Sequence, residues 1–351
     1  MRRRAVALLA VALVLLWRPV LYPSGKAALL LLDVYSPTLL GTNVAALITP
    51  EPRVAETRET LGGVEMRVSW WRPGWGDRHP ALLIVNGATP VGNDNLATRQ
   101  FGTSLARAGY LVMLPELPFL REGRLDPDGP RIVDAAFASL RALPETAGLP
   151  VGVFAASVGA GVALSASGSE PAIGRADHLI VLGGYFDIDT YVASVGGHAQ
   201  RTDRGLVAWE PSDEVKERFP PAVIAAMSDE HDRDIVRSAF ASSGYESALS
   251  RLRDLSPRGR AVLDRLSPRA VWSSVAPPVF WLHDPDDSYE PLAEAYAAQA
   301  APRSGRFALI VPRLVQHAEV GAGAKGQDPL VLAGELARLL GFTLEVLRNA
   351  G

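Results

Sequence analysis

Short, uninterrupted apolar runs alternate with helix-like segments from about residue 60 to the end of the chain. Strands buried on both faces of a sheet read as such runs, and they are typical of parallel sheets covered by helices on both faces. The strand candidates of this kind are residues 81–87, 110–115, 149–155, 178–184, 277–284 and 306–312. Residues 63–73 alternate instead between apolar and polar, as a half-buried strand does. The helix candidates between and after them are residues 95–110, 130–143, 157–167, 291–300 and 328–347. The alternation predicts an α/β fold with a mostly parallel central sheet flanked by helices.

One long segment, residues 188–276, breaks this alternation. It is polar, rich in charge and helical in pattern, and it contains no run typical of a buried strand. We interpret it as a helical cap inserted between two strands, a position from which caps shape active-site entrances. The predicted core is then residues 60–187 and 277–351, preceded by a lead-in segment at 27–59.

The N-terminus begins with three arginines after Met1, followed by an uncharged apolar run at residues 5–17. A basic segment before a short apolar segment is the form of a secretory signal, although this run is shorter than the roughly 20 residues of a comfortable membrane span. Small residues suited to cleavage are poorly placed. We therefore expect residues 1–26 to export the protein or anchor it to a membrane, with the predicted α/β core outside the cytoplasm. The alternative is a buried N-terminal helix of a cytoplasmic protein.

Composition excludes several classes of function. The formal net charge is −3, so no large basic surface indicates nucleic acid as a partner. The chain has no cysteine, which excludes disulfides, thiolate metal sites and a cysteine nucleophile. Nothing in the composition indicates an oligomeric state.

A serine stands at one predicted junction between strand and helix. Ser157 has Ala155 two residues before it and Gly159 two residues after it. A turn that presents a nucleophile at the end of a strand is strained and needs small residues at both places. The same pattern also occurs around serines that only pack in tight junctions, so it leaves both readings open.

A serine nucleophile needs a base, and the base needs a carboxylate that orients it. Of the six histidines, only His283 and His317 lie in loops after strands, where catalytic groups gather in such sheets. Carboxylates follow the strand at 277–284, and the candidates are Asp284, Asp286 and Asp287. Capping of the next helix is the structural alternative for any one of them.

The order Ser157, then an aspartate at 284–287, then His317, each after its own strand, resembles the α/β-hydrolase superfamily of serine esterases and lipases. In that family a segment His-Gly-x-x-Asp-x-x-Val-Pro follows the seventh strand. The resemblance implies that Asp287 is the acid and His317 the catalytic base. It also implies a structural role for His283.

This chain departs from the family segment at two places: Asp284 replaces its glycine and Glu290 replaces its valine. The resemblance further implies an oxyanion hole formed by two backbone N–H groups, those of Val158 and Ala88, with Thr89 as the alternative to Ala88.

Two aromatic residues follow the strand at 178–184. Tyr185 and Phe186 could line an acyl pocket together with Thr89, or they could be core aromatics. The sequence alone does not decide between these two placements.

The resemblance implies a hydrolase that acts on carboxylic esters through an acyl-enzyme intermediate, with a small-molecule substrate and without metal or cofactor. The cluster of acids at 284–287 could also bind a metal ion, but this alternative is disfavoured because no second cluster accompanies it. An acyltransferase would use the same triad, and a non-catalytic binding protein could keep the same fold. A dinucleotide-binding protein is disfavoured because the stretch around Ser157 lacks the Gly-x-Gly-x-x-Gly spacing.

Overall fold

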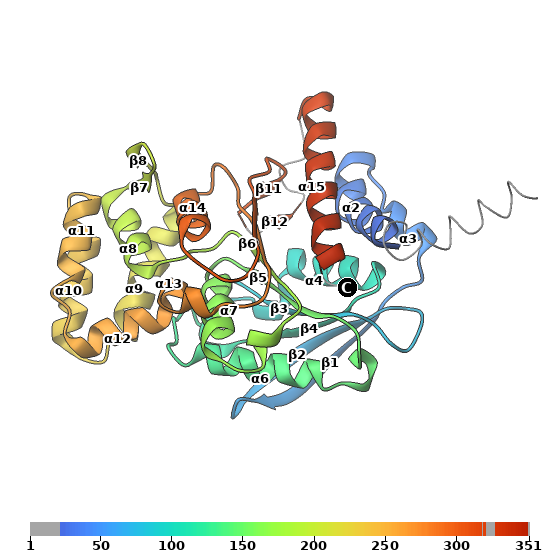
Figure 1. Ribbon diagram of the computed structural model, residues 1–351, viewed down its shortest axis with the longest axis horizontal. Helices are drawn as coiled ribbons and strands as arrows, with labels where there is room; N and C mark the ends of the chain where they lie inside the picture. The colour runs from blue at the N-terminus through green and yellow to red at the C-terminus, as the bar shows by residue number, and fades with distance from the viewer. Residues whose placement is uncertain (1–21, 318, 321–326, 350–351) are drawn as a thin grey trace, which may run out of the picture.

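The computed structural model describes residues 22–317, 319–320 and 327–349, and a twisted eight-stranded sheet forms its centre (Figure 1). The strands lie in the order β1-β2-β4-β3-β5-β6-β9-β10. Strand β2 pairs antiparallel with β1 and β4, and every other pair is parallel. Their bounds are β1 Arg53–Leu61, β2 Val64–Arg72, β3 Ala81–Val85, β4 Leu111–Pro115, β5 Val151–Ala156, β6 Leu179–Leu182, β9 Val279–Leu282 and β10 Phe307–Ile310. The predicted α/β class and mostly parallel sheet are confirmed.

Helices cover both faces of the sheet and bury two hydrophobic clusters against it. Successive residues of β5 divide between them: Val153 and Ala155 belong to one cluster, Phe154 and Ala156 to the other. This alternation follows from the two-residue side-chain period of a strand, and it explains why a strand with helices on both sides is apolar throughout. The helices are α4 Leu96–Arg107, α5 Pro118–Arg121, α6 Gly129–Arg141, α7 Val158–Ser169, α14 Leu292–Ala300 and α15 Pro329–Asn349.

The segment predicted as a cap contains a group of helices that lies beyond one end of the sheet (Figure 1). It also contains a small antiparallel hairpin, β7 Ala199–Thr202 with β8 Gly205–Ala208, that the sequence pattern did not predict. Both strands are only four residues long and have no buried side chain. The sequence of β7 is largely polar, and the apolar run of β8 is too short to indicate a strand. The helices are α8 Ile188–Gly197, α9 Asp213–Ala226, α10 Glu230–Phe240, α11 Tyr245–Leu252, α12 Pro257–Leu266 and α13 Pro268–Val271.

The segment predicted as a lead-in is part of the core. Helix α2 (Tyr22–Leu40), followed by α3 (Val44–Ile48), packs against α4 and α15, and Tyr35 of α2 is buried in the second cluster. Asp33 and Arg107 form a buried ion pair at 3.2 Å that joins α2 to α4. Strand β1 forms the exposed edge of the sheet, which is why its charged sequence gave no strand pattern.

The predicted anchor lies mostly outside the described residues. The apolar run at 5–17 is among the residues that the structure does not describe, and residues 22–26 belong to α2. Within the described part of the chain, no helix combines the length and the apolar character needed to cross a membrane.

Candidate active site

Ser157 sits on a sharp turn between β5 and α7, with φ 52° and ψ −139°. Positive φ is uncommon for a residue other than glycine, and such strain gathers at functional sites. The Ser157 N–H donates to the carbonyl oxygens of Leu182 at 3.0 Å and Gly183 at 2.9 Å, both at the end of the neighbouring strand β6. These two bonds hold the strained residue at the carboxyl end of the sheet.

Gly159, two residues after the turn, has a steric reason to lack a side chain. A Cβ added there would lie 2.2 Å from the carbonyl oxygen of Asn86, in the loop after β3. The two backbones therefore approach so closely that only glycine fits. Ala155, at the other position that the turn requires to be small, is fully buried in β5.

We expect Gly159→Ala to lower the free energy of unfolding by about 1–3 kcal/mol, because overpacked backbone must move apart. Gly334→Ala is the matched control, since Gly334 also lies in a helix, α15, but an added Cβ meets no atom within 4 Å. Alanine at that position should stabilise the helix by about 0.5–1 kcal/mol. Urea unfolding of both variants tests the contrast, and equal effects would refute the close approach.

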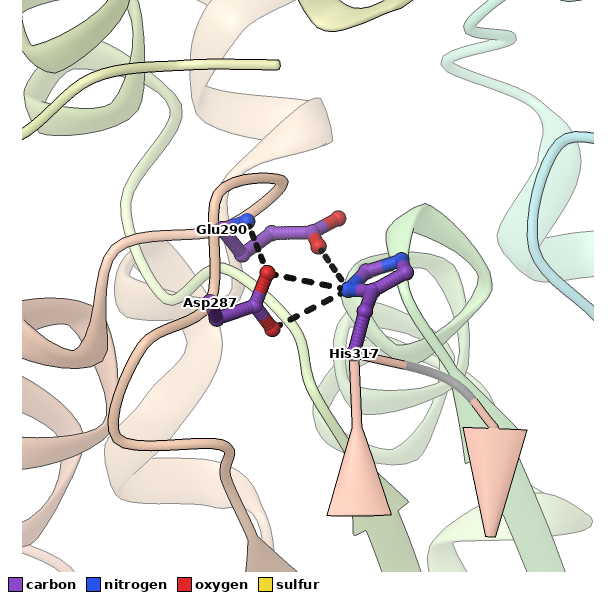
Figure 2. A group of neighbouring side chains, drawn as sticks. All are labelled: Asp287, Glu290 and His317. Atoms are coloured by element: carbon purple, nitrogen blue, oxygen red, sulfur yellow. Dashed lines mark hydrogen bonds and ion pairs between the residues drawn. The ribbon is translucent and has the colours of Figure 1, made fainter. Parts of the chain in front are cut away.

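Asp287 and His317 meet at the same edge of the sheet, after β9 and β10 (Figure 2). Nδ1 of His317 lies 3.1 and 3.0 Å from the two carboxylate oxygens of Asp287. The Asp287 carboxylate is buried and also accepts the backbone N–H groups of Tyr289 at 2.7 Å and Glu290 at 3.1 Å. It is thus held in one orientation against the imidazole.

The two other aspartates of this loop occupy different places. Asp284 accepts the backbone N–H of His317 at 3.2 Å and so holds the main chain of that residue, not its ring. Asp286 donates its backbone N–H to Asp284 at 3.0 Å, within the turn. Of the three candidate acids, only Asp287 contacts the imidazole through its carboxylate.

The side chain of His283 is fully buried. Its Nε2 is 2.9 Å from the carbonyl oxygen of Glu290, and its Nδ1 accepts the indole N–H of Trp281 at 3.2 Å. Burial lowers the pKa of His283, which favours the neutral ring. The placement suits the structural role that the resemblance implies, because the ring ties the loop that carries Asp287 to β9.

Glu290 is the residue that sequence reasoning did not assign to the site. Its side chain is fully buried, and Oε1 accepts the hydroxyl hydrogen of Ser157 at 2.9 Å. Its Oε2 lies 3.1 Å from Nδ1 of His317. The only signal in the sequence was an acidic residue where the family segment has valine.

Three ionisable groups therefore share one buried space. Burial raises the pKa of Glu290 to about 7, and the charge of Asp287 adds to the rise. Burial lowers the pKa of His317, but the charges of Glu290 and Asp287 outweigh it and raise this pKa to about 9. Burial acts to raise the pKa of Asp287, but its contact with His317 outweighs burial and keeps the pKa below the usual range.

A cavity of about 260 Å³ opens beside Ser157, between the loop after β3 and the cap helix α9. Three predicted residues, Ala88, Thr89 and Val158, line it together with Ser157 and His317. The remaining lining residues are Asn86, Gly87, Asn95, Thr98, Gly123, Arg124, Leu125, Tyr191, Glu214, Val215, Arg218, Phe219, Ala222, Tyr289 and Glu290.

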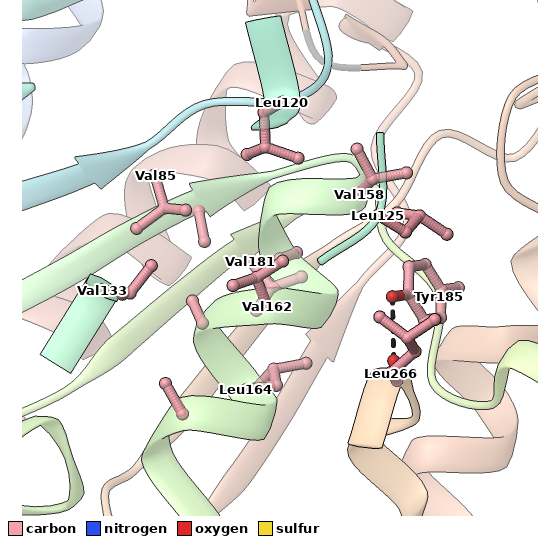
Figure 3. Packing of buried hydrophobic residues seen from close by; sticks show 14 of the residues in the cluster. Val85, Leu120, Leu125, Val133, Val158, Val162, Leu164, Val181, Tyr185 and Leu266 are labelled. Atoms are coloured by element: carbon pink, nitrogen blue, oxygen red, sulfur yellow. Dashed lines mark hydrogen bonds between the residues drawn. The ribbon is translucent and has the colours of Figure 1, made fainter. Parts of the chain in front are cut away.

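Tyr185 and Phe186 do not line this cavity. Both are buried in the hydrophobic core, and the Tyr185 hydroxyl donates to the carbonyl oxygen of Leu266 at 2.9 Å (Figure 3). Tyr185 and Phe186 are therefore core aromatics and do not form an acyl pocket. The apolar lining of the cavity comes instead from Leu125, Val158 and helix α9.

Asp287, Glu290 and His317 offer three atoms within 4.8 Å of one another, an arrangement of the kind that could hold a metal ion. Their atoms already contact one another and Ser157. Because these contacts account for the cluster, we interpret it as an acid–base site.

Comparison with known proteins identifies the fold of this chain but not its activity. No protein-family model matches the sequence, and no curated protein matches it. Among solved structures, a brefeldin A esterase, described as a bacterial homologue of human hormone sensitive lipase, superposes with a TM-score of 0.51 at 18% identity. The match covers 93% of this chain and 86% of the esterase. This chain has the α/β-hydrolase fold.

Two further α/β-hydrolase structures give similar scores. The 2,6-dihydroxy-pseudo-oxynicotine hydrolase matches 84% of this chain and 69% of its own, with a TM-score of 0.51 at 17% identity. The acylaminoacyl peptidase of Pyrococcus horikoshii matches 86% of this chain, with a TM-score of 0.52 at 13% identity. The matched part is only 43% of the peptidase chain. The resemblance found in the sequence is thus confirmed for the fold. Identities this low do not establish the activity or the substrate, which are inferred from the residues of the site.

Proposed function

We propose that this α/β-hydrolase-fold protein is a serine hydrolase that acts on carboxylic esters. One observation carries the proposal: Ser157, on a strained turn, and His317, paired with the buried Asp287, line one cavity at the carboxyl edge of the sheet. A nucleophile, ionisable partners and a space for a substrate are the elements that acyl transfer needs. The proposed catalytic residues are Ser157, Asp287 and His317.

In the proposed reaction, the Ser157 oxygen attacks the ester carbonyl. Its proton passes to the neighbouring acid–base group, which Asp287, Glu290 and His317 form. The negative charge that develops on the carbonyl oxygen is stabilised by the backbone N–H groups of Val158 and Ala88, which border the cavity. Donors preorganised in this way contribute a few kcal/mol each. The proton taken from Ser157 is given to the departing alcohol, and an acyl-enzyme remains. Water then attacks the acyl carbonyl, losing a proton to the same group, and the acid leaves as the proton returns to the Ser157 oxygen.

The cavity limits the substrate class. A volume of about 260 Å³ suits a small ligand. Three apolar residues of α9, Val215, Phe219 and Ala222, line the same cavity as Ser157 and favour a short acyl chain. The rim carries Arg124 and Arg218, each in an ion pair with a nearby glutamate, so its net charge is small.

Hydrolysis of p-nitrophenyl esters of increasing acyl length tests the proposal. We expect turnover with acetate and butanoate esters and a decline for long chains, because the cavity is small. An added alcohol acceptor distinguishes transfer from hydrolysis, since an acyltransferase would form a new ester in preference to the free acid. A folded protein that hydrolyses none of these esters and reacts with no serine-directed probe would favour a non-catalytic binding protein.

A further inference from the structure

Glu290 joins the nucleophile to the imidazole of the site. Its Oε1 accepts the hydroxyl hydrogen of Ser157 at 2.9 Å. Its Oε2 lies 3.1 Å from Nδ1 of His317 (Figure 2). The Glu290 side chain is fully buried, so solvent and salt screen these contacts much less than they screen surface contacts. An ionisable group therefore lies between nucleophile and base, where the family segment has an apolar valine.

Nδ1 of His317 faces two carboxylates at once. It lies 3.1 and 3.0 Å from the oxygens of Asp287 and 3.1 Å from Oε2 of Glu290. Among the described residues, neither carboxylate forms an ion pair with an arginine or a lysine. Two buried negative charges without a cation cost free energy, and a protonated imidazole beside them offsets part of that cost. The arrangement therefore favours the imidazolium form of His317.

The hydrogen bond of Ser157 is consistent with a protonated imidazole. An imidazolium has a hydrogen on both ring nitrogens and no acceptor, so a serine hydroxyl cannot donate to it. Glu290 provides the acceptor for that hydroxyl instead. These are the hydrogen bonds expected of a resting state, in which the base already carries a proton.

We propose that Glu290 is a positioning residue whose charge favours the protonated, resting form of His317, so that hydrolysis begins only at alkaline pH. The proposal deepens the proposed function and rests on it, because it takes His317 to be the base of Ser157. His317 must lose its extra proton to solvent before it can accept the proton of Ser157. Without the charge of Glu290, that loss occurs at lower pH.

The direction of the pH dependence follows from the charges at the site. Burial alone would lower the pKa of His317, but the charge of Glu290 and the contact with Asp287 raise it to about 9. Burial raises the pKa of Glu290 to about 7. Between these two values the glutamate is ionised and the imidazole is still protonated. Because a base acts only in its deprotonated form, kcat/KM should rise as pH increases through about 9.

The other titratable groups around His317 do not replace the effect of Glu290. Asp284 raises the pKa of His317 in the same direction, but by less than Glu290 does. The Tyr289 ring stacks on the imidazole with 4.2 Å between the ring centroids, and burial raises the pKa of its hydroxyl. The remaining groups are neutral or paired: His283, whose pKa burial lowers, Tyr185 and Tyr191, whose pKa burial raises, and the ion pairs Arg124–Glu122 and Arg218–Glu214.

The first experiment measures kcat/KM for p-nitrophenyl acetate from about pH 6 to about pH 10, with the uncatalysed rate subtracted at each pH. Glu290→Gln removes the charge of this side chain and nearly keeps its shape. We expect the rise in kcat/KM to move to lower pH by about one unit or more. Glu290→Val, which introduces the residue of the family segment, should shift the rise in the same direction.

Glu294→Gln is the matched control for the loss of a buried carboxylate. Glu294 is also buried, and burial raises its pKa to about 7 as well. It accepts the backbone N–H groups of Phe186 and Asp187 and does not line the cavity. The rise in kcat/KM of E294Q should therefore occur at the same pH as in wild type.

The second experiment observes His317 directly and does not depend on catalysis. NMR titration of the imidazole resonances of the full chain gives the pKa of each histidine, and the resonance that His317→Gln removes identifies His317. We expect it to titrate at about pH 9 in wild type. In E290Q and E290V it should titrate about one unit or more lower, because one of the two negative charges beside the ring is gone.

The outcomes separate this inference from the proposed function. If His317 titrates at the same pH in wild type, E290Q and E290V, the inference is wrong, while Ser157 and His317 stay the proposed nucleophile and base. A rise in kcat/KM that E290Q leaves at the wild-type pH would refute it equally. If ester hydrolysis survives Ser157→Ala, the proposed function itself fails, even where the titration of His317 shifts.

Discussion

Ser157→Ala is expected to abolish ester hydrolysis, with a fall in kcat of about 10⁵-fold or more, the scale seen when a serine nucleophile is removed. The loss follows because no acyl-enzyme can form without the Ser157 oxygen. The strained turn should survive, since alanine has the Cβ that serine has and the backbone N–H bonds to Leu182 and Gly183 remain. Labelling by a fluorophosphonate should disappear in the same variant.

Ser165→Ala provides the control for this loss. Ser165 lies on the same helix α7 and is buried, and its hydroxyl has no hydrogen-bond partner among the described residues. We expect this variant to label and hydrolyse as wild type does. Labelling of S157A at the wild-type rate would contradict the assignment of the nucleophile.

Asp287→Asn is expected to lower kcat by about 10⁴-fold, comparable to the loss of a triad aspartate elsewhere. The carboxylate contacts Nδ1 of His317 through both oxygens and stabilises the charged ring. An amide would remove that charge and with it the orientation of the imidazole. The measurement is kcat on a short p-nitrophenyl ester at neutral pH, with circular dichroism to verify folding.

Asp284→Asn is the comparison that makes this prediction specific. Asp284 lies three residues earlier in the same loop and accepts only the backbone N–H of His317. Its amide could still accept that bond, so we expect a loss of less than about tenfold. A larger loss in D284N than in D287N would mean that the acid is wrongly assigned.

The sheet was predictable because its information is local. A strand buried on both faces must be apolar along its whole length. The apolar sequences of β3, β4 and β5 therefore indicate these strands directly. Strand β1 and helix α2 were missed for the same physical reason. The side chains of β1 face solvent at the sheet edge, and the apolar residues of α2 did not reveal that they pack on α4 and α15.

The site was predictable only in part. The order of Ser157, Asp287 and His317 along the chain identified residues that the fold brings to one edge of the sheet. Glu290 could not be found in this way, because its role depends on a contact with a residue 133 positions away. Burial gives this glutamate its raised pKa, and the sequence does not show that burial.

Fluorophosphonate labelling of the wild-type chain, followed by intact-mass measurement and peptide mapping, tests the central claim most directly. We expect one modification per chain, on Ser157, because among the described serines only this one lies on a strained turn beside a buried acid–base group and a cavity. A folded protein that stays unmodified, or one modified at another residue, would contradict it.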